Sequence, residues 1–201
     1  MEYEQGWDRR LQIHTSGLDE ANADPYRFRY EPTPYCVLER LADIGLIRAD
    51  DTVLDYGCGK GRVDFFLAQR TGAATIGIEY DPGVYQQALE NQRTAAIQTT
   101  ADFVLTHAEG YPVPDRVNRC YFFNPFSVEI LHKVIARLTE SYYAHPREIL
   151  LFFYYPSEEY LSYLMTVDVL EFHSEISCGD LFDRFDARER IVIFSFPDYR
   201  Y

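Results

Sequence analysis

The chain has 201 residues, with 32 Asp and Glu against 19 Lys and Arg, so its formal net charge is −13 at pH 7. That length is sufficient for one domain with a sizeable core, held together without disulfides or a structural metal. The negative charge disfavours a general electrostatic grip on nucleic-acid phosphates or anionic lipid, because both need a basic face. A local basic groove is still compatible with it.

Apolar runs and cysteines narrow the class of protein further. No stretch reaches the roughly 18 apolar residues that a membrane span needs, and the N-terminus lacks the apolar run of an export signal. Cys36, Cys58, Cys120 and Cys178 lie far apart and form no C-x-x-C pair, which predicts reduced thiols. We therefore expect a cytoplasmic protein with no membrane association, disulfide framework or metal site.

From Asp51 onward, short apolar runs alternate with helical segments, the pattern of parallel β-α-β units. The expected strands are 52–56, 75–79, 102–106, 119–123 and 148–155, and the expected helices are 33–47, 61–70, 82–93, 127–141 and 156–165. Two further runs, 169–174 and 190–196, are too close together for a parallel crossover. The prediction is an α/β fold with a mostly parallel seven-stranded sheet, helices on both faces and an antiparallel C-terminal edge hairpin.

The segment before the first strand is predicted to be an extension, residues 1–32, to a domain of residues 33–201. Residues 1–25 are polar and are expected to be loosely ordered. A Tyr-rich segment follows, with Tyr26, Tyr30 and Tyr35. Its place ahead of the first strand suits a lid over a site at that strand's carboxyl end.

The most informative motif follows the first predicted strand. Asp55 lies near the strand's end, and Gly57, Gly59 and Gly61 then alternate with Cys58 and Lys60 before a helix begins. Glycines at these positions permit a tight strand-to-helix turn whose backbone approaches a ligand closely. The spacing differs from the dinucleotide pattern G-x-G-x-x-G, and an acidic residue beside a pyrophosphate would be repelled. A cationic ligand suits it better.

A second carboxylate, Glu79, ends the next predicted strand, where it can accept hydrogen bonds from both hydroxyls of a ribose. With these residues the chain resembles the class I S-adenosylmethionine-dependent methyltransferases over roughly residues 33–196, which implies a Rossmann-like fold. The resemblance implies S-adenosyl-L-methionine as the cofactor, with binding residues Asp55, Gly57, Cys58, Gly59, Gly61, Glu79, Tyr80, His107, Ala108 and Asn124. In that family Tyr80 would pack on the adenine, and His107 stands where an Asp is usual. Cys58 is read as a small residue that fills the turn.

A third motif, Phe122 to Phe126 (FFNPF), resembles the N-P-P-Y motif of methyltransferases that act on planar nitrogens. Phe126 stands where that motif has its second proline. We expect the Asn124 side-chain oxygen and the Pro125 carbonyl to accept from the N–H groups of an acceptor amine, with Phe126 against its ring. Asn124, Pro125 and Phe126 are therefore the predicted catalytic residues.

Three functions stay open. The first is methylation of a nitrogen on a small molecule or protein side chain. The second is methylation of an adenine-type base in RNA or DNA, which the motif favours and the net charge disfavours. The third is non-catalytic binding of S-adenosylmethionine. Aromatic residues are dense after residue 120 and predict a pocket that stacks a flat acceptor or encloses an amine. Neither the acceptor nor the oligomeric state follows from the sequence alone.

Overall fold

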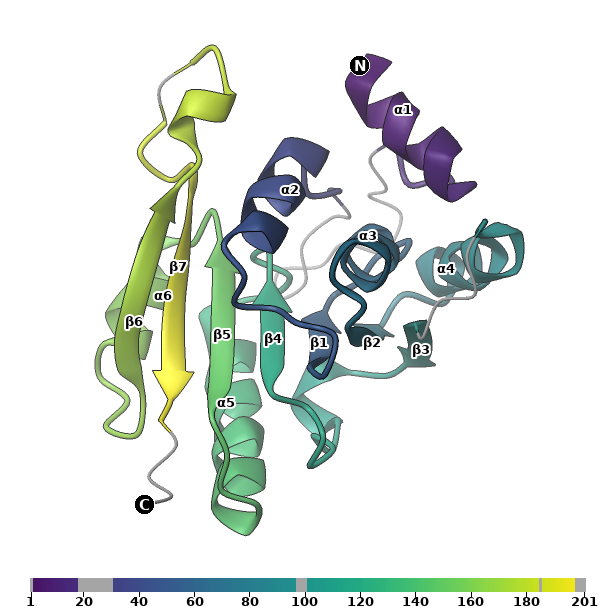
Figure 1. The fold of residues 1–201 in the computed structure, drawn as a ribbon. Coiled ribbons are helices and arrows are strands. Elements are labelled where there is room, and N and C mark those ends of the chain that lie inside the picture. Colours follow the sequence, from purple (N-terminus) through teal and green to yellow (C-terminus); the bar gives the residue numbers. More distant parts are fainter. Residues whose placement is uncertain (1, 18–30, 97–100, 185, 198–201) are drawn as a thin grey trace.

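The computed structural model describes residues 2–17, 31–96, 101–184 and 186–197. Its centre is a seven-stranded sheet in the order β3-β2-β1-β4-β5-β7-β6 (Figure 1). The strands are β1 (Thr52–Tyr56), β2 (Ala74–Glu79), β3 (Ala101–Leu105), β4 (Arg119–Phe122), β5 (Ile149–Tyr154), β6 (Glu171–Ser177) and β7 (Arg190–Phe196). The first five pair in parallel, and β7 pairs antiparallel with both β5 and β6. The predicted α/β sheet is confirmed, with β7 inserted inside it and β6 as its edge.

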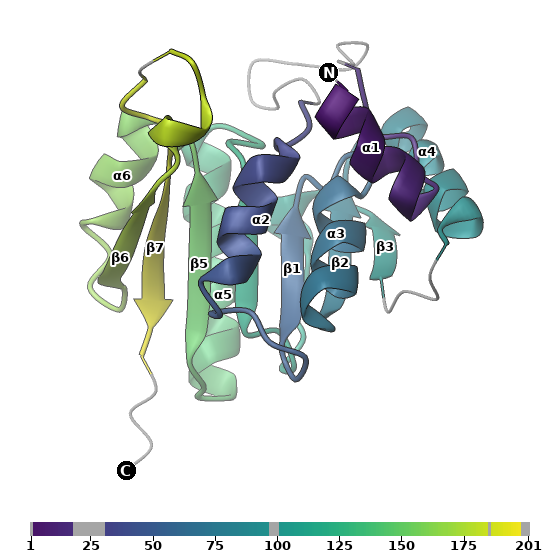
Figure 2. The same ribbon diagram turned by 45° about the horizontal axis from the view of Figure 1, so that its top comes forward.

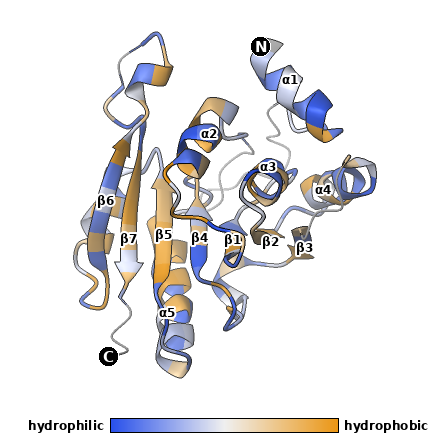
Figure 3. Cartoon of the chain, viewed as in Figure 1, coloured by the Kyte–Doolittle hydropathy of each residue, from blue (hydrophilic) through white to orange (hydrophobic). Residues whose placement is uncertain are grey.

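Helices cover both faces of this sheet (Figure 2). Helices α2 (Tyr35–Asp43) and α3 (Arg62–Thr71) pack on one hydrophobic cluster, and α5 (Val128–Ala144) and α6 (Glu158–Leu164) pack on another. Helix α4 (Pro82–Thr94) lies beside α3. Strand β5 is hydrophobic along most of its length because both its faces are covered (Figure 3). No helix within the described ranges has the length and hydropathy to cross a bilayer.

Two predicted boundaries need correction. Helix α2 was expected over 33–47 but runs from Tyr35 to Asp43, because Pro34 precedes it and Gly45 follows with φ +72°. Strand β6 was expected over 169–174 but extends to Ser177, past an irregularity between Phe172 and Ser174.

The expectation of a loosely ordered N-terminus is wrong for residues 2–17. Helix α1 (Glu2–Leu11) forms there, and Leu11 and Ile13 are each only 1% exposed. Tyr3, Trp7 and Leu11 recur every four residues, which places them on one face of the helix. Leu11 belongs to the hydrophobic cluster under α2 and α3, and Trp7 packs against that cluster. The predicted lid residues Tyr26 and Tyr30 lie outside the described residues.

Candidate active site

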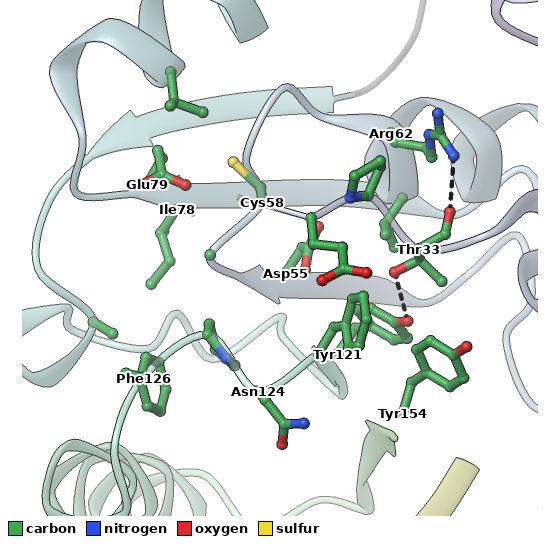
Figure 4. A pocket seen from close by; sticks show the side chains of 18 of the residues that line it. Thr33, Asp55, Cys58, Arg62, Ile78, Glu79, Tyr121, Asn124, Phe126 and Tyr154 are labelled. Carbon is green, nitrogen blue, oxygen red and sulfur yellow. Dashed lines mark hydrogen bonds between the residues drawn. The ribbon is translucent and has the colours of Figure 1, made fainter. Parts of the chain in front are cut away.

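A cavity of about 540 Å³ lies at the carboxyl ends of the parallel strands (Figure 4). Its wall includes Asp55 from β1, Glu79 from β2, Asn124 from the loop after β4 and Tyr154 from β5. Strand order reverses between β1 and β4, and ligands of open α/β sheets bind at such a point. The volume is in the range of small-molecule sites.

The glycine loop, residues 57–61, has a backbone that other residues rarely adopt. Gly57, Gly59 and Gly61 have φ values of +76°, +58° and +84°. A Cβ atom on Gly57 would lie 2.6 Å from the Cβ of Pro125, which belongs to the loop after β4. The glycines therefore allow both the turn and the close approach of two loops that form the cavity.

The Glu79 carboxylate links the glycine loop to the turn after β2. Its Oε2 accepts from the Gly59 amide at 3.0 Å, and its Oε1 accepts from the amides of Tyr80 and Asp81 at 2.8 and 2.9 Å. Burial raises the pKa of Glu79, although these three amide donors act in the opposite direction. Each oxygen can accept more than one hydrogen bond, so the side chain is held rigidly and can still bind a ligand hydroxyl.

Behind the cavity wall, Asp55 meets a second buried carboxyl, that of Asp64 in α3. Asp64 is 0% exposed, and neither its oxygens nor Asp55 Oδ2 has a hydrogen-bond donor among the described residues. Burial raises the pKa of Asp55 to about 7, and burial and the neighbouring Asp55 raise that of Asp64 well above its ordinary value. Burial therefore favours the protonated form of each carboxyl in this pair.

Stability should fall as this pair ionises. Both pKa values are raised in the folded chain, so stability is full below the ordinary carboxyl pKa and declines as pH rises from about 4 to about 7. Asp64→Asn is expected to raise the free energy of unfolding by about 1–2 kcal/mol at about pH 8 and much less at about pH 5. Thermal unfolding at both pH values checks this. Asp102→Asn, at an exposed site, is the control. An equal gain for Asp64→Asn at both pH values would contradict the raised pKa of Asp64.

Arg62, the first residue of α3, ties the N-terminal segment to the site. It is 3% exposed, its Nε donates to Thr15 Oγ1 at 2.7 Å, and its Nη1 donates to the Thr33 carbonyl at 3.1 Å. It forms an ion pair with Glu4, and its Nη2 lies 3.8 Å from Asp8 Oδ1. The guanidinium charge is thereby balanced locally, and residues 4–16 are fixed beside the glycine loop.

Thr33 also contributes directly to the cavity wall. Its hydroxyl lies 2.9 Å from that of Tyr121, and both residues face the space beside Asp55 (Figure 4). The segment ahead of α2 thus forms one side of the site.

The structure brings most of the predicted site residues together. Asp55, Gly57, Cys58, Glu79, Tyr80, Ala108, Asn124, Pro125 and Phe126 line the cavity. Gly59 reaches it through its bond to Glu79, and Gly61 makes the turn into α3. His107 is exposed and stacks on Tyr80, with 6.4 Å between ring centroids. It is not among the lining residues, whereas its neighbours Thr106 and Ala108 are.

Cys58 lines the cavity but is not suited to act as a nucleophile. Burial raises the pKa of its thiol well above the ordinary value, and the nearby carboxylates of Asp64, Glu79 and Asp55 raise it further. Because the thiolate is the reactive form, Cys58 stays an unreactive thiol. This agrees with the interpretation of Cys58 as a small residue in the turn.

The side chain of Asn124 bridges the loops after β4 and β5. Its Nδ2 donates to the Tyr155 carbonyl at 2.5 Å, and its Oδ1 accepts from the Ser157 amide at 3.3 Å. Phe126 is 4% exposed and its ring packs edge-on against Tyr56, so it belongs to the core as well as to the cavity wall. Both residues therefore have structural contacts besides the role predicted for them.

Sequence reasoning missed several lining residues, among them Arg62, Tyr121, Phe182 and Glu189. Tyr121 sits within a strand that reads as buried core, and Arg62 sits at the start of an otherwise apolar helix face. Phe182 and Glu189 come from the connection between β6 and β7, which only the folded hairpin brings to the cavity. No short-range signal in the sequence marks them.

Known proteins resemble this chain in sequence and in structure. Residues 53–144 match the profile of a family described as a methyltransferase domain. A ribosomal protein L11 methyltransferase from Cupriavidus pinatubonensis is 34% identical over 83 residues, 41% of this chain and 27% of that protein. A protein-lysine N-methyltransferase from Saccharolobus islandicus is 32% identical over 76 residues, 37% of this chain and 47% of that protein. The chain thus aligns with less than half the length of either relative.

Among solved structures, an RNA methyltransferase from Salinibacter ruber, crystallised with S-adenosyl-L-homocysteine, superimposes with a TM-score of 0.53 at 17% identity. The match covers 85% of this chain and 97% of that one, and it supports the fold. The profile match contains the glycine loop, Glu79 and the loop of Asn124. Residues 53–144 thus match a methyltransferase domain, and the fold of the chain is similar to that of the Salinibacter ruber methyltransferase.

Proposed function

We propose that this chain binds S-adenosylmethionine at the glycine loop and methylates a nitrogen on a protein side chain or a small molecule. The observation that carries the proposal is the cradle formed by Asp55, the glycine loop and Glu79. It combines backbone that residues other than glycine rarely adopt with two buried carboxyl groups at the carboxyl ends of neighbouring strands.

The residues present fit the cofactor's charge. Of the described residues that line the cavity, the acidic ones are Glu31, Asp55, Glu79, Asp81, Glu109 and Glu189, and the basic one is Arg62. When bound, S-adenosylmethionine supplies a methyl group on a positively charged sulfur, and its transfer leaves a neutral thioether. Glu79 would hold the ribose hydroxyls, Tyr80 and Ala108 the adenine, and Asp55 with the glycine loop the methionine part.

The protein's own contribution is mainly positioning and exclusion of water. Pro125 packs against Gly57, so the loop that would present the acceptor touches the loop that would hold the cofactor. The Asn124 oxygen has a second lone pair beside its bond to Ser157, and with the Pro125 carbonyl it can accept from an amine's N–H groups. Phe126 would form the wall behind that nitrogen.

Two observations favour a protein side chain or small molecule over a nucleic-acid base. Both curated relatives are named for action on protein. The net charge of −13 and the acidic cavity disfavour the binding of a nucleic acid, because its backbone phosphates are also negatively charged. The Salinibacter ruber protein is named for action on RNA, but the similarity to it concerns the fold.

The proposal is tested by binding and by transfer. Calorimetry should show S-adenosylhomocysteine binding to the wild type, and methyl-tritiated cofactor should label a lysine-containing peptide or a primary amine rather than total RNA. Asn124→Ala should keep cofactor affinity and lose about tenfold or more in transfer, because acceptor orientation is lost. Glu140→Ala, at an exposed site on α5, is the control. Label in RNA alone would contradict the acceptor class, and wild-type turnover of Asn124→Ala would remove that residue from the mechanism.

A further inference from the structure

The end of the cavity away from Glu79 is built from aromatic side chains and one carboxylate. This acceptor end consists of Phe123, Tyr154, Tyr155, Phe182 and Glu189. Figure 4 shows Tyr154 on the far side of Asp55 and Tyr121 from Glu79. None of these five residues is needed by the cofactor cradle described above, so they are available to a second ligand.

Two residues in or beside the acceptor end have a strained backbone conformation. Asn124 and Tyr155 have φ values of +40° and +49°, in the left-handed region that non-glycine residues seldom occupy. They follow neighbouring strands, both line the cavity, and the Asn124 side chain is hydrogen-bonded to the Tyr155 carbonyl. Strained residues of this kind cluster at functional sites, because the surrounding structure must enforce them.

The carboxylate of Glu189 is fixed beside these rings. The Tyr154 hydroxyl donates to Glu189 Oε2 at 2.7 Å, and Tyr154 itself is buried. The rings of Phe123 and Tyr154 pack with 4.7 Å between centroids, and those of Phe123 and Tyr155 with 6.4 Å. A rigid carboxylate next to packed aromatic rings is the arrangement that binds an organic cation, through the ion pair and through cation–π attraction.

The charges around the acceptor end include one cation, the Arg188 guanidinium, which lies 4.4 Å from the Tyr155 ring centroid and is paired with Asp186 at 3.5 Å. Asp55, 3% exposed and with Oδ2 lacking a donor among the described residues, lies between Glu79 and Tyr154. The basic lining residue, Arg62, pairs with Glu4 and approaches Asp8, so it adds little positive charge to the cavity. An anionic acceptor would be repelled by the Glu189 carboxylate, whereas a cationic one would be attracted to it.

We propose that the acceptor end binds a cationic aliphatic amine, with Glu189 as its counter-charge and Tyr154 and Tyr155 as the walls around it. Before transfer the ammonium gives up one proton to solvent, and the nitrogen lone pair that this frees takes the methyl group as the bond from methyl to sulfur breaks. This inference rests on the proposed function and names the substrate class of the same site. The amine belongs either to a lysine side chain or to a free small molecule. Both sources share the chemistry that the acceptor end recognises.

The test uses three probes of one shape and different charge. Benzylamine, benzyl alcohol and benzoate are titrated into the full chain at about pH 7 after saturation with S-adenosylhomocysteine. Benzylamine is expected to bind at least about tenfold more tightly than benzyl alcohol, and benzoate more weakly still. Nα-acetyl-lysine amide forms a further arm. Binding of either amine supports the proposal, and the tighter of the two identifies the source.

Substitutions test which residues cause the preference for benzylamine over benzyl alcohol. Glu189→Gln keeps an acceptor for the Tyr154 hydroxyl and should abolish the preference for benzylamine over benzyl alcohol without changing S-adenosylhomocysteine affinity. Tyr154→Phe removes the bond that fixes Glu189 and should reduce that preference. Glu140→Gln, outside the cavity, is the control. Benzoate binding as tightly as benzylamine, or unchanged selectivity in Glu189→Gln, would overturn the inference. Failure of the wild-type chain to bind S-adenosylhomocysteine would instead overturn the proposed function.

Discussion

Replacing Arg62 with methionine is expected to lower the free energy of unfolding by about 3–5 kcal/mol, because it leaves the buried carboxylate of Asp8 and the half-buried one of Glu4 without their cation. The Arg62 guanidinium forms ion pairs with Glu4 and Asp8 and donates hydrogen bonds to the Thr15 hydroxyl and the Thr33 carbonyl. It also lies over the Tyr35 ring, 4.3 Å from its centroid. Urea denaturation measures the loss.

Arg70→Met is the matched control for this change, since Arg70 lies in the same helix. Its ion pair with Asp43 is exposed, at 52% and 62% for the two side chains, so its loss should cost at most about 1 kcal/mol. Arg62→Met should also weaken S-adenosylhomocysteine binding, because Thr33 lines the cavity. Equal, small effects of the two substitutions would contradict the buried network and the fixed N-terminal segment.

The second large effect is expected for Gly57→Ala. The new methyl group would lie 2.6 Å from the Pro125 Cβ, so the glycine loop and the loop after β4 must move apart. We expect S-adenosylhomocysteine affinity to fall by about tenfold or more, which corresponds to about 1.4 kcal/mol of binding free energy. Calorimetric titration measures it.

Gly45→Ala is the control that separates the effect of the contact with Pro125 from the effect of backbone strain. Gly45 has φ +72°, close to that of Gly57, but a Cβ there would meet nothing within 4 Å. Both variants should therefore lose about 1–2 kcal/mol of stability from the left-handed conformation. Only Gly57→Ala should also lose affinity. Comparable affinities in the two variants would show that the two loops do not have to touch.

The fold was largely predictable because its elements have local signals. Apolar runs predicted the bounds of β1 and β7. Asp81, directly ahead of the predicted helix 82–93, accepts hydrogen bonds from the Gly83 and Val84 amides at 2.7 and 3.1 Å. Helix α1 was missed because its segment is mostly polar, and its place depends on the buried Arg62 network. That network joins residues far apart in sequence, which no local pattern reveals.

Some residues of the candidate site could also be predicted from local sequence patterns, and others could not. The glycine loop and Glu79 were predictable because positive φ angles and strand ends leave marks in the sequence. Glu189 and Phe182 were not, since only the pairing of β6 with β7 brings them to the cavity. The predicted site residue His107 is exposed and stacks on Tyr80, which lines the cavity. The end of the cavity proposed to bind the cofactor was thus predictable from local patterns, and the proposed acceptor end depended on tertiary structure.

The most direct measurement is a crystal structure of the chain with S-adenosylhomocysteine. The account predicts ribose hydroxyls on the Glu79 carboxylate, adenine between Tyr80 and Ala108, and the sulfur directed toward Asn124 and the acceptor end. A ligand bound elsewhere, or one whose sulfur faces away from Asn124 and Tyr154, would contradict it.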